Sequence, residues 1–265
     1  MNKYEYSNKL ALVTGASSGI GKVYAKQLAA RGSHIVLVAR SQDKLEAIAG
    51  DIKRQYGVQA VVLACDLSQA DAPRQLADQI AELGLTVDIL INNAGFGTHG
   101  RFEELDPGRE QEEIMLNSAS LVDLTHRLLP HMLQRGDGVI VNVASMAAFM
   151  PCAYSAVYGA TKAFVISFSE ALWAEMRGRG VRVLALCPGA TDTGFFDAVG
   201  SGADMAAGNK LSTPEKVVQA GFRGIDQGRS FIIEGRSNSF MAQMIRFVSR
   251  RRVALIMERM TRPKN

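Results

Sequence analysis

A tyrosine and a lysine four positions apart, Tyr158 and Lys162, are the side chains of this sequence best suited to moving a proton. Residues with that spacing share one face of a helix, so the ammonium can lie beside the phenol. A free phenol has a pKa of about 10 and exchanges protons poorly near neutrality, whereas a nearby cation favours the phenolate. The pair is therefore interpreted as an acid/base in which Lys162 lowers the pKa of Tyr158.

A glycine-rich turn far upstream indicates what this acid/base works beside. The segment Thr14-Gly-Ala-Ser-Ser-Gly-Ile-Gly21 directly follows a short apolar run and opens a helical pattern. Glycines let the backbone turn tightly and approach a pyrophosphate, which then lies at a helix N-terminus. The alternative is a tight strand-to-helix connection without a ligand. A second motif, Asn92-Asn-Ala-Gly95, disfavours that alternative because it places amides and small residues after a later apolar run.

Short apolar runs predict the strands that position these motifs. Amphipathic stretches between the runs, including 44–56, 72–83, 110–134 and 155–177, predict helices. Such alternation with β-branched runs implies a parallel sheet covered on both faces. We therefore expect an α/β fold, a single Rossmann-type doubly wound domain over 1–235 with about seven parallel strands flanked by helices. The expected strands are 10–13, 35–39, 60–64, 88–91, 139–143, 181–186 and 231–233.

Two regions interrupt this alternation. The segment 192–210 is rich in Gly and Ala and fits a lid over a site. From 236 to 265 the chain carries eight Lys/Arg and one Asp/Glu, so this tail has a net charge of +7 and the remainder −3. Within the tail, 240–260 alternates apolar residues with arginines and predicts a basic amphipathic helix. We favour docking of this helix on the body or on a second subunit, and peripheral contact with anionic lipid is the alternative.

Composition excludes several classes of protein. The chain has 265 residues, 47% hydrophobic and 21% charged, which is typical of a globular protein with a sizeable core. Its three cysteines form no CxxC and its four histidines show no metal spacing, so neither a disulfide framework nor a metal site is expected. Residues 1–9 lack the apolar core of a signal peptide, and no apolar run reaches about 18 residues. We expect a cytoplasmic protein that does not bind nucleic acid.

The motifs together resemble the short-chain dehydrogenase/reductase family, in its TGxxxGxG and YxxxK branch, over about residues 8–235. The resemblance implies hydride transfer between a nicotinamide cofactor and a carbonyl or secondary alcohol, with no metal. It implies that Tyr158 exchanges the proton and that Lys162 also holds the nicotinamide ribose. It further implies that Ser145 orients the substrate oxygen and that Asn117 holds a water in a proton relay. In the family's order the motifs are Thr14–Gly21, Asp66, Asn92–Gly95, Asn117, Ser145, Tyr158, Lys162 and Pro188-Gly189.

The end of the second expected strand favours NADP over NAD. NAD-selective proteins place an Asp or Glu there, whereas this chain has Ala39 followed by Arg40. A guanidinium matches the 2′-phosphate of NADP, although Arg40 as a mere cap of a surface loop is the alternative. The resemblance assigns Asp66 to the adenine. The expected cofactor-binding residues are Gly15, Ser17, Ser18, Gly19, Ile20, Gly21, Arg40, Asp66, Leu67, Asn93, Ala94, Gly95, Tyr158, Lys162, Pro188, Gly189, Thr191 and Thr193.

The expected substrate pocket is mostly apolar, which favours a ketone or aldehyde without a charged group. The leading hypothesis is an NADP-dependent carbonyl reductase, which the resemblance makes a homodimer or homotetramer through the long helices. Two alternatives stay open, a catalytically silent NADP-binding regulator and a sugar-nucleotide epimerase or dehydratase. The glycine spacing disfavours the latter. The pocket residues are Phe96, Ala147, Tyr154 and Phe195, with Met146, Phe149, Cys152 and Gly189 as further candidates.

Overall fold

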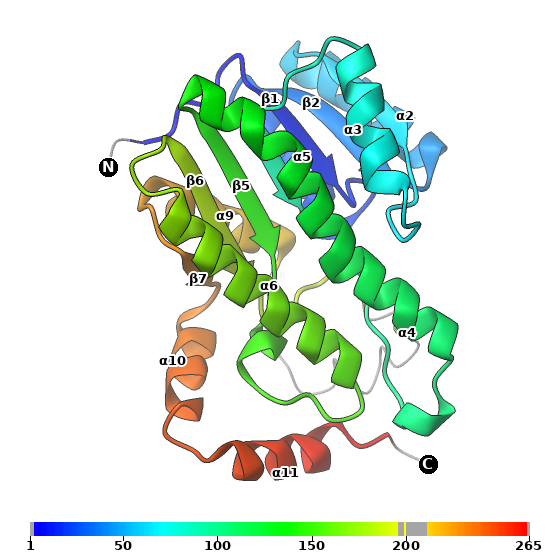
Figure 1. The fold of residues 1–265 in the computed structure, drawn as a ribbon, viewed down its shortest axis with the longest axis vertical. Coiled ribbons are helices and arrows are strands. Elements are labelled where there is room, and N and C mark those ends of the chain that lie inside the picture. The colour runs from blue at the N-terminus through cyan, green and yellow to red at the C-terminus, as the bar shows by residue number, and fades with distance from the viewer. Residues whose placement is uncertain (1–2, 196–198, 200–210, 264–265) are drawn as a thin grey trace.

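Seven parallel strands form one sheet in the order β3-β2-β1-β4-β5-β6-β7 (Figure 1). The computed structural model describes residues 3–195, 199 and 211–263. Every predicted strand is confirmed, with ends that differ by one residue at most, and so is the doubly wound α/β class. The strands are β1 (Leu10–Thr14), β2 (His34–Ala39), β3 (Ala60–Ala64), β4 (Ile89–Asn92), β5 (Gly138–Val143), β6 (Val181–Cys187) and β7 (Phe231–Ile233).

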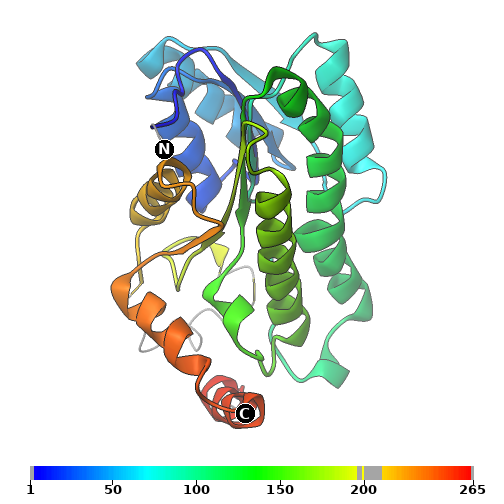
Figure 2. The same cartoon turned by 60° about the vertical axis from the view of Figure 1, so that its left-hand side comes forward.

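The strands are apolar along their whole length because both faces of the sheet are covered. Successive side chains of a strand point to opposite faces. In β1, Ala11 and Val13 belong to one buried cluster, whereas Leu12 belongs to the other. Figure 2 shows the sheet between two layers of helices. One layer is α1 (Gly19–Ala29), α2 (Gln42–Tyr56) and α9 (Pro214–Asp226), and the other is α3 (Ala72–Glu82), α5 (Ser120–Arg135) and α6 (Ala156–Glu175).

The strand order reverses between β1 and β4, which are direct neighbours with Val13 opposite Ile91. Loops that leave two such strands diverge to opposite faces and open a crevice at the carboxyl edge of the sheet. The glycine-rich turn follows β1, and Asn93 begins the loop after β4. The two sequence motifs therefore meet at the position where doubly wound folds bind ligands.

The helix expected over 110–134 extends beyond both predicted ends, from Pro107 to Arg135, and its α-helical hydrogen bonding is interrupted by a π-helical segment. Its first part, α4 (Pro107–Ile114), begins at Asp106, whose carboxylate accepts hydrogen bonds from the Gly108 and Arg109 amides. A π-helical segment, η2 (Met115–Ala119), then joins α4 to α5, and the Ser120 amide bonds to the Met115 carbonyl five residues back. Such π segments occur frequently at functional sites. This one contains Asn117.

The prediction of a single helix over 240–260 is wrong. Two helices, α10 (Arg236–Ile245) and α11 (Arg250–Thr261), are separated by residues 246–249. The break redirects the chain so that α11 docks on the body, where Glu258 accepts a hydrogen bond from the Tyr154 hydroxyl at 3.1 Å. Both helices lie beyond the carboxyl ends of β5 and β6 (Figure 1).

The lid predicted over 192–210 falls largely on residues 196–198 and 200–210, outside the described residues. Within the described part, none of the helices is both long enough and apolar enough to span a membrane.

Candidate active site

The glycines of the turn after β1 stand where a side chain would collide with the neighbouring loops. Gly15 has a φ of +63°, and a Cβ there would lie 2.7 Å from the Asn93 amide nitrogen. A Cβ on Gly21 would lie 2.3 Å from the Gly15 carbonyl oxygen. Ser18 precedes α1 without a side-chain cap, so the first amides of that helix remain available to an anion. This cradle fits a pyrophosphate.

Thr14 joins the glycine turn to the loop after β4. Its hydroxyl accepts hydrogen bonds from the Asn93 and Ala94 amides, both at 2.9 Å, and donates to the Ile91 carbonyl. The Asn93 side chain donates in return to the Thr14 and Gly15 carbonyls at 3.0 and 3.3 Å. These bonds hold both loops in one arrangement and confirm that the two motifs lie side by side.

Other expected cofactor residues lie around this cradle. The Ala16 amide bonds to the Val38 carbonyl at 3.1 Å, so the end of β2 and the exposed Arg40 adjoin the turn. Thr193 comes from the loop after β6, and its Cγ2 would lie 2.9 Å from a Cβ on Gly19. The residues from all three loops fit a nicotinamide dinucleotide.

Asp66 and Leu67 begin the loop after β3. The Asp66 carboxylate accepts from the Ser68 amide and hydroxyl, and the Leu67 carbonyl accepts from the Ser120 hydroxyl at 2.5 Å. The Cys65 amide bonds to the Ala39 carbonyl, which brings this loop to the end of β2.

The start of α6 and the end of β5 bring the predicted catalytic side chains together. Tyr158 and Lys162 lie one turn apart on α6, with the ammonium 5.7 Å from the centre of the phenol ring. Ser145 follows β5, and its hydroxyl accepts a hydrogen bond from the Ala147 amide at 3.1 Å. The Met146 amide bonds to the Pro188 carbonyl, which ties this segment to the loop after β6.

The phenol of Tyr158 keeps its proton more firmly than the sequence predicted. Burial raises its pKa to about 12, with the Ser145 hydroxyl acting in the opposite direction and Cys152 and Glu113 adding to the rise. The sequence predicted a net lowering of this pKa, whereas burial raises it in this structure. Desolvation of the phenolate outweighs the effect of a cation that donates its hydrogen bond elsewhere.

That hydrogen bond runs from the Lys162 ammonium to the Val143 carbonyl at 3.1 Å. Lys162 is only 6% exposed, and burial lowers its pKa to about 8, against the opposing charge of Glu113. An ammonium has three donors. Two therefore remain for ligand hydroxyls.

Asn117 is held rigidly at the π segment. Its side-chain nitrogen donates to the Phe96 carbonyl at 2.9 Å and to the Thr161 hydroxyl at 3.1 Å, and its side-chain oxygen accepts from the Phe96 amide at 3.2 Å. A Cβ on Gly95 would lie 2.7 Å from that oxygen and 3.3 Å from the Lys162 nitrogen. The structure therefore places Asn117 next to Lys162 and uses its side chain to fix the loop after β4.

The four expected pocket residues do not share one wall. Phe195 lies against Tyr158, with ring centres 5.3 Å apart, and Ala147 follows Ser145. Phe96 is buried, and the Arg109 guanidinium carbon lies 3.6 Å from the centre of its ring. That face of the ring is therefore covered by Arg109 and is not open to a substrate.

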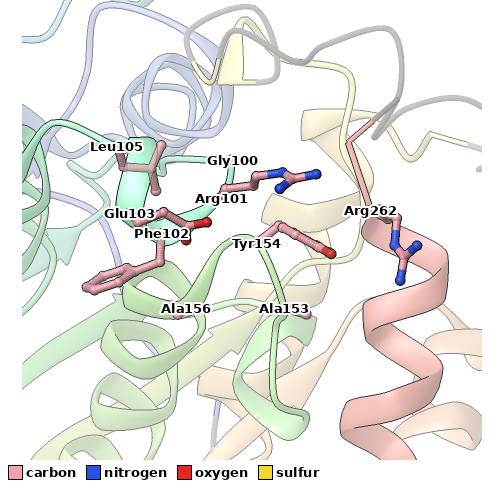
Figure 3. A pocket seen from close by; sticks show the side chains of 9 residues that line it. All are labelled: Gly100, Arg101, Phe102, Glu103, Leu105, Ala153, Tyr154, Ala156 and Arg262. Atoms are coloured by element: carbon pink, nitrogen blue, oxygen red, sulfur yellow. The ribbon is translucent and has the colours of Figure 1, made fainter. Parts of the chain in front are cut away.

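Tyr154 lines a cavity of about 450 Å³ that does not include Tyr158 (Figure 3). Its side chain points toward Arg262 at the end of α11, with Arg101 and Phe102 on the other side of the cavity. The backbone of Tyr154 has a φ of +60°, a conformation that costs a bulky residue about 1 to 2 kcal/mol. Its carbonyl accepts from the Gly100 amide at 2.8 Å, which stabilises this conformation.

Several residues of the site were not predicted. Gly97 has no room for a side chain, since a Cβ would lie 2.9 Å from Tyr158 Cδ2 and 3.1 Å from Phe195 Cζ. Asn238 of α10 fills the space at Gly189, where a Cβ would lie 2.4 Å from its amide nitrogen. Glu110 and Glu113 are buried charged residues on α4. Of these residues, only Gly97 could have been suspected from the sequence, because it lies two positions after the Asn92–Gly95 motif.

Among the described residues, no three His, Cys, Asp or Glu side chains gather in a way that could hold a metal ion. All three cysteines are free thiols.

The sequence model of the family described as short chain dehydrogenase matches residues 9–204. A very-long-chain 3-oxoacyl-CoA reductase of Anas platyrhynchos is 39% identical over 184 residues, which are 67% of this chain and 58% of that protein. The chain thus matches less than two thirds of that relative's length. A ketoacyl reductase, HetN, of Nostoc sp. is 33% identical over 86% of this chain and 78% of its own length.

A solved structure has the same fold. A short-chain dehydrogenase from Sphingobium yanoikuyae in complex with NADPH superposes with a TM-score of 0.82, at 32% identity over 94% of both chains. The site geometry, the family match and these relatives agree. The chain belongs to the short-chain dehydrogenase/reductase family of oxidoreductases.

Proposed function

We propose that this protein reduces an apolar ketone or aldehyde with NADPH and that Tyr158 donates the proton. The observation that carries the proposal is the convergence of Tyr158, Ser145 and Lys162 beside the glycine cradle. The nicotinamide supplies hydride chemistry when bound. The raised pKa of Tyr158 keeps the phenol protonated at neutral pH, which is the form that a reduction requires.

Each neighbouring side chain has a distinct task. Ser145 orients the carbonyl oxygen toward Tyr158. Lys162 holds the ribose with its two spare donors and stabilises the negative charge that develops on the phenol oxygen. Asn117 fixes the loop after β4 and supports a water relay to Lys162. The hydride acceptor would then lie at the Tyr158 hydroxyl, with the ring of Phe195, which packs against the Tyr158 ring, as part of the apolar surroundings.

NADP is preferred over NAD in this proposal because of Arg40. The residue is exposed at the end of β2, next to the turn that would hold the pyrophosphate. No carboxylate stands among residues 39–41 to accept the ribose 2′-hydroxyl of NAD. The NADPH complex of the Sphingobium yanoikuyae relative is consistent with this assignment.

The reductase domain would span 1–235, with 192–210 as a lid, and would form a homodimer through α5 and α6. An apolar surface on α6 supports the dimer: Phe164 is 45% exposed and its ring stacks on Phe168 with the two planes 3° apart. Light scattering coupled to gel filtration tests this. Phe164→Glu should yield monomers, and an unchanged mass would contradict the proposed interface.

A second candidate role concerns the tail, which we infer contacts an anionic membrane surface from the cytoplasmic side. Of the twelve large apolar side chains that are exposed in the described part of the chain, eight lie in 240–260. The same segment exposes Arg246, Arg250, Arg251, Arg252 and Arg259. Arginines beside apolar side chains are typical of helices that lie in a lipid interface.

Liposome co-sedimentation tests the tail. Vesicles containing phosphatidylserine should bind the protein and pure phosphatidylcholine vesicles should not, with Phe247→Ser and Arg251→Glu each weakening binding. Leu83 is an exposed apolar residue at the end of α3, so Leu83→Ser is the matched control. This variant should bind the phosphatidylserine vesicles as the wild type does. Failure to bind phosphatidylserine would contradict membrane contact. Loss of dimers in Phe247→Ser would instead assign this surface to a second copy.

The reductase proposal itself is tested by NADPH oxidation across apolar and polyhydroxylated ketones and aldehydes, including a 3-oxoacyl thioester. Apolar carbonyls should be reduced fastest. If NADPH binds but no compound is reduced, the protein is a silent binding protein and the proposal is wrong.

A further inference from the structure

The two tail helices each have a face that docks on the body of the protein. Ala242 of α10 and Val253 of α11 are buried. Met244 and Leu255 lie two positions further along the same helices, on the opposite side, and are exposed. Both helices lie past the carboxyl ends of β5 and β6, where the loops with the predicted catalytic residues leave the sheet (Figure 1). The docked face of the tail therefore meets the region of the active site.

The helix α10 contacts the segments that follow β5 and β6. It packs against η3 (Met146–Phe149), which directly follows Ser145. In the loop after β6, a Cβ on Gly189 would first meet three atoms of the Asn238 side chain, at 2.4, 3.1 and 3.3 Å. The Asn238 amide is itself fixed by a hydrogen bond to the Glu234 carbonyl at 2.8 Å. Asn238 thus lies directly on the Gly189 backbone.

The loop that Asn238 contacts belongs to the expected cofactor site. It begins at Pro188, whose carbonyl accepts a hydrogen bond from the Met146 amide at 2.9 Å. The Thr191 hydroxyl donates to the Gly189 carbonyl at 2.9 Å, so the loop is also bonded within itself. A shift of Gly189 would therefore move the whole loop against the bound nicotinamide.

The last turns of α11 contact the residues that lead into α6. The Tyr154 hydroxyl donates to Glu258 Oε1 at 3.1 Å. The Thr261 hydroxyl lies within hydrogen-bonding distance of the Ala153 carbonyl, at 2.9 Å, and of the Met257 carbonyl of its own helix. The end of the tail is thus joined to two consecutive residues just before the catalytic helix.

Tyr154 is the residue at which such support matters. Its φ of +60° is unfavourable for a bulky side chain, and the bond to Glu258 helps to hold the residue in that conformation. The next residue is Ser155, whose carbonyl accepts the first hydrogen bond of α6, from the Gly159 amide at 3.0 Å. Tyr158 lies in this first turn. A relaxation of Tyr154 would therefore reach the catalytic phenol through the intervening backbone.

We propose that the tail completes the active site, with Asn238 and Glu258 as positioning residues for the reduction. Asn238 holds Gly189 of the cofactor loop, and Glu258 holds Tyr154 at the entrance of the catalytic helix. The inference rests on the proposed function, since it assumes that α6 carries the acid and that the loop after β6 holds the nicotinamide. Neither positioning residue contacts substrate or cofactor in this role.

Steady-state kinetics at saturating NADPH test the contact with Tyr154. Glu258→Ala should lower kcat/KM by about three- to tenfold, the range expected for one hydrogen bond, and leave the Kd for NADPH unchanged. Glu258→Gln keeps an acceptor for the hydroxyl and should recover most of the loss. Tyr154→Phe should match Glu258→Ala, and the double variant should lose no more than either single one. Glu82→Ala, at an exposed glutamate of α3, is the matched control and should behave like wild type.

Three results would overturn the role of Glu258. Wild-type kinetics in Glu258→Ala would show that the contact has no effect on the reaction. Equal losses in Glu258→Ala and Glu258→Gln would show that the hydrogen bond is not the cause. Additive losses in the double variant with Tyr154→Phe would show that the two side chains act separately.

A pair of substitutions at Gly189 and Asn238 tests the other contact. Asn238→Ala should lower kcat about tenfold while KM for the carbonyl is kept, because the nicotinamide is misplaced rather than lost. Gly189→Ala should be impaired as well, since its methyl group collides with Asn238. The double variant should be more active than Gly189→Ala, because the methyl group then fits the vacated space. Ser237→Ala, an exposed position of α10, is the control. A double variant no better than Gly189→Ala would overturn the contact.

Hydrogen exchange followed by mass spectrometry, without cofactor or substrate, separates this inference from the proposed function. Glu258→Ala should speed exchange in peptides spanning 153–159, and Asn238→Ala should do so in peptides spanning 186–193. If the wild type reduces no carbonyl, the proposed function fails, and the tail contacts are still judged by these exchange rates. Unchanged exchange in both variants would overturn the inference.

Discussion

The Lys162 ammonium lies 5.7 Å from the centre of the Tyr158 ring and donates its hydrogen bond to the Val143 carbonyl rather than to the phenol. Burial therefore dominates both pKa values, raising that of Tyr158 to about 12 and lowering that of Lys162 to about 8. Of the two, the lysine is the group that changes its charge near physiological pH.

We predict that the alkaline limit of carbonyl reduction follows Lys162. Below about pH 8 both the ammonium and the phenol keep their protons, and above it the ammonium is lost first. A plot of kcat/KM against pH should therefore fall on the alkaline side with an apparent pKa near 8. A rate that stays constant up to about 10, the ordinary pKa of lysine and tyrosine, would contradict the assignment.

Removal of the lysine charge should stabilise the fold. A pKa lowered from 10.5 to about 8 means that the charged Lys162 destabilises the folded state by about 3 kcal/mol at neutral pH. Loss of the hydrogen bond to the Val143 carbonyl costs about 1 kcal/mol of that gain. The free energy of unfolding of Lys162→Met, measured in urea, should therefore exceed that of the wild type by about 2 kcal/mol. As pH rises from 8 to 10.5 the unfolded wild type binds more protons than the folded one, and its stability should approach that of the variant. A less stable variant at neutral pH would contradict this account.

Arg40 should discriminate between the two cofactors. A hydrogen-bonded ion pair with the 2′-phosphate contributes about 1.5 to 3 kcal/mol, so Arg40→Ala should raise the Kd for NADPH at least about tenfold and leave that for NADH nearly unchanged. Fluorescence titration measures both. Arg54→Ala, another exposed arginine, on α2, is the control and should alter neither. Equal losses for the two cofactors would refute the 2′-phosphate contact.

Gly97 should be intolerant of a methyl group. Its Cβ would lie 2.9 Å from Tyr158 Cδ2, so Gly97→Ala must displace the phenol or Phe195. We expect kcat to fall at least about tenfold while NADPH affinity is kept, since misplacing a reacting group by about 1 Å costs up to a hundredfold. Gly50→Ala, on α2 with no heavy atom within 4 Å of the added methyl, should behave like wild type. A fully active Gly97→Ala would contradict the packing.

Much of the fold and of the site was predictable because it depends on local sequence. Buried β-branched runs predicted all seven strands, and the glycine spacing predicted the cradle at Gly15 and Gly21. Contacts between distant segments were not predictable. The burial that raises the pKa of Tyr158, and the packing of α4 against α6, exist only once the helices have come together.

The same limit applies to the tail. Its apolar and basic pattern is continuous through 246–249, yet the chain breaks there so that Glu258 can reach Tyr154. Periodicity reports a helix but not the point where docking interrupts it.

The central claim is that the Tyr158 hydroxyl delivers the proton, and Tyr158→Phe tests it most directly. The change removes one oxygen and keeps the ring that packs against Phe195. We predict that NADPH binds with wild-type affinity while kcat for the best carbonyl substrate falls by at least about a hundredfold, the contribution of a positioned acid. A variant that binds NADPH and reduces the substrate at close to the wild-type rate would contradict the account.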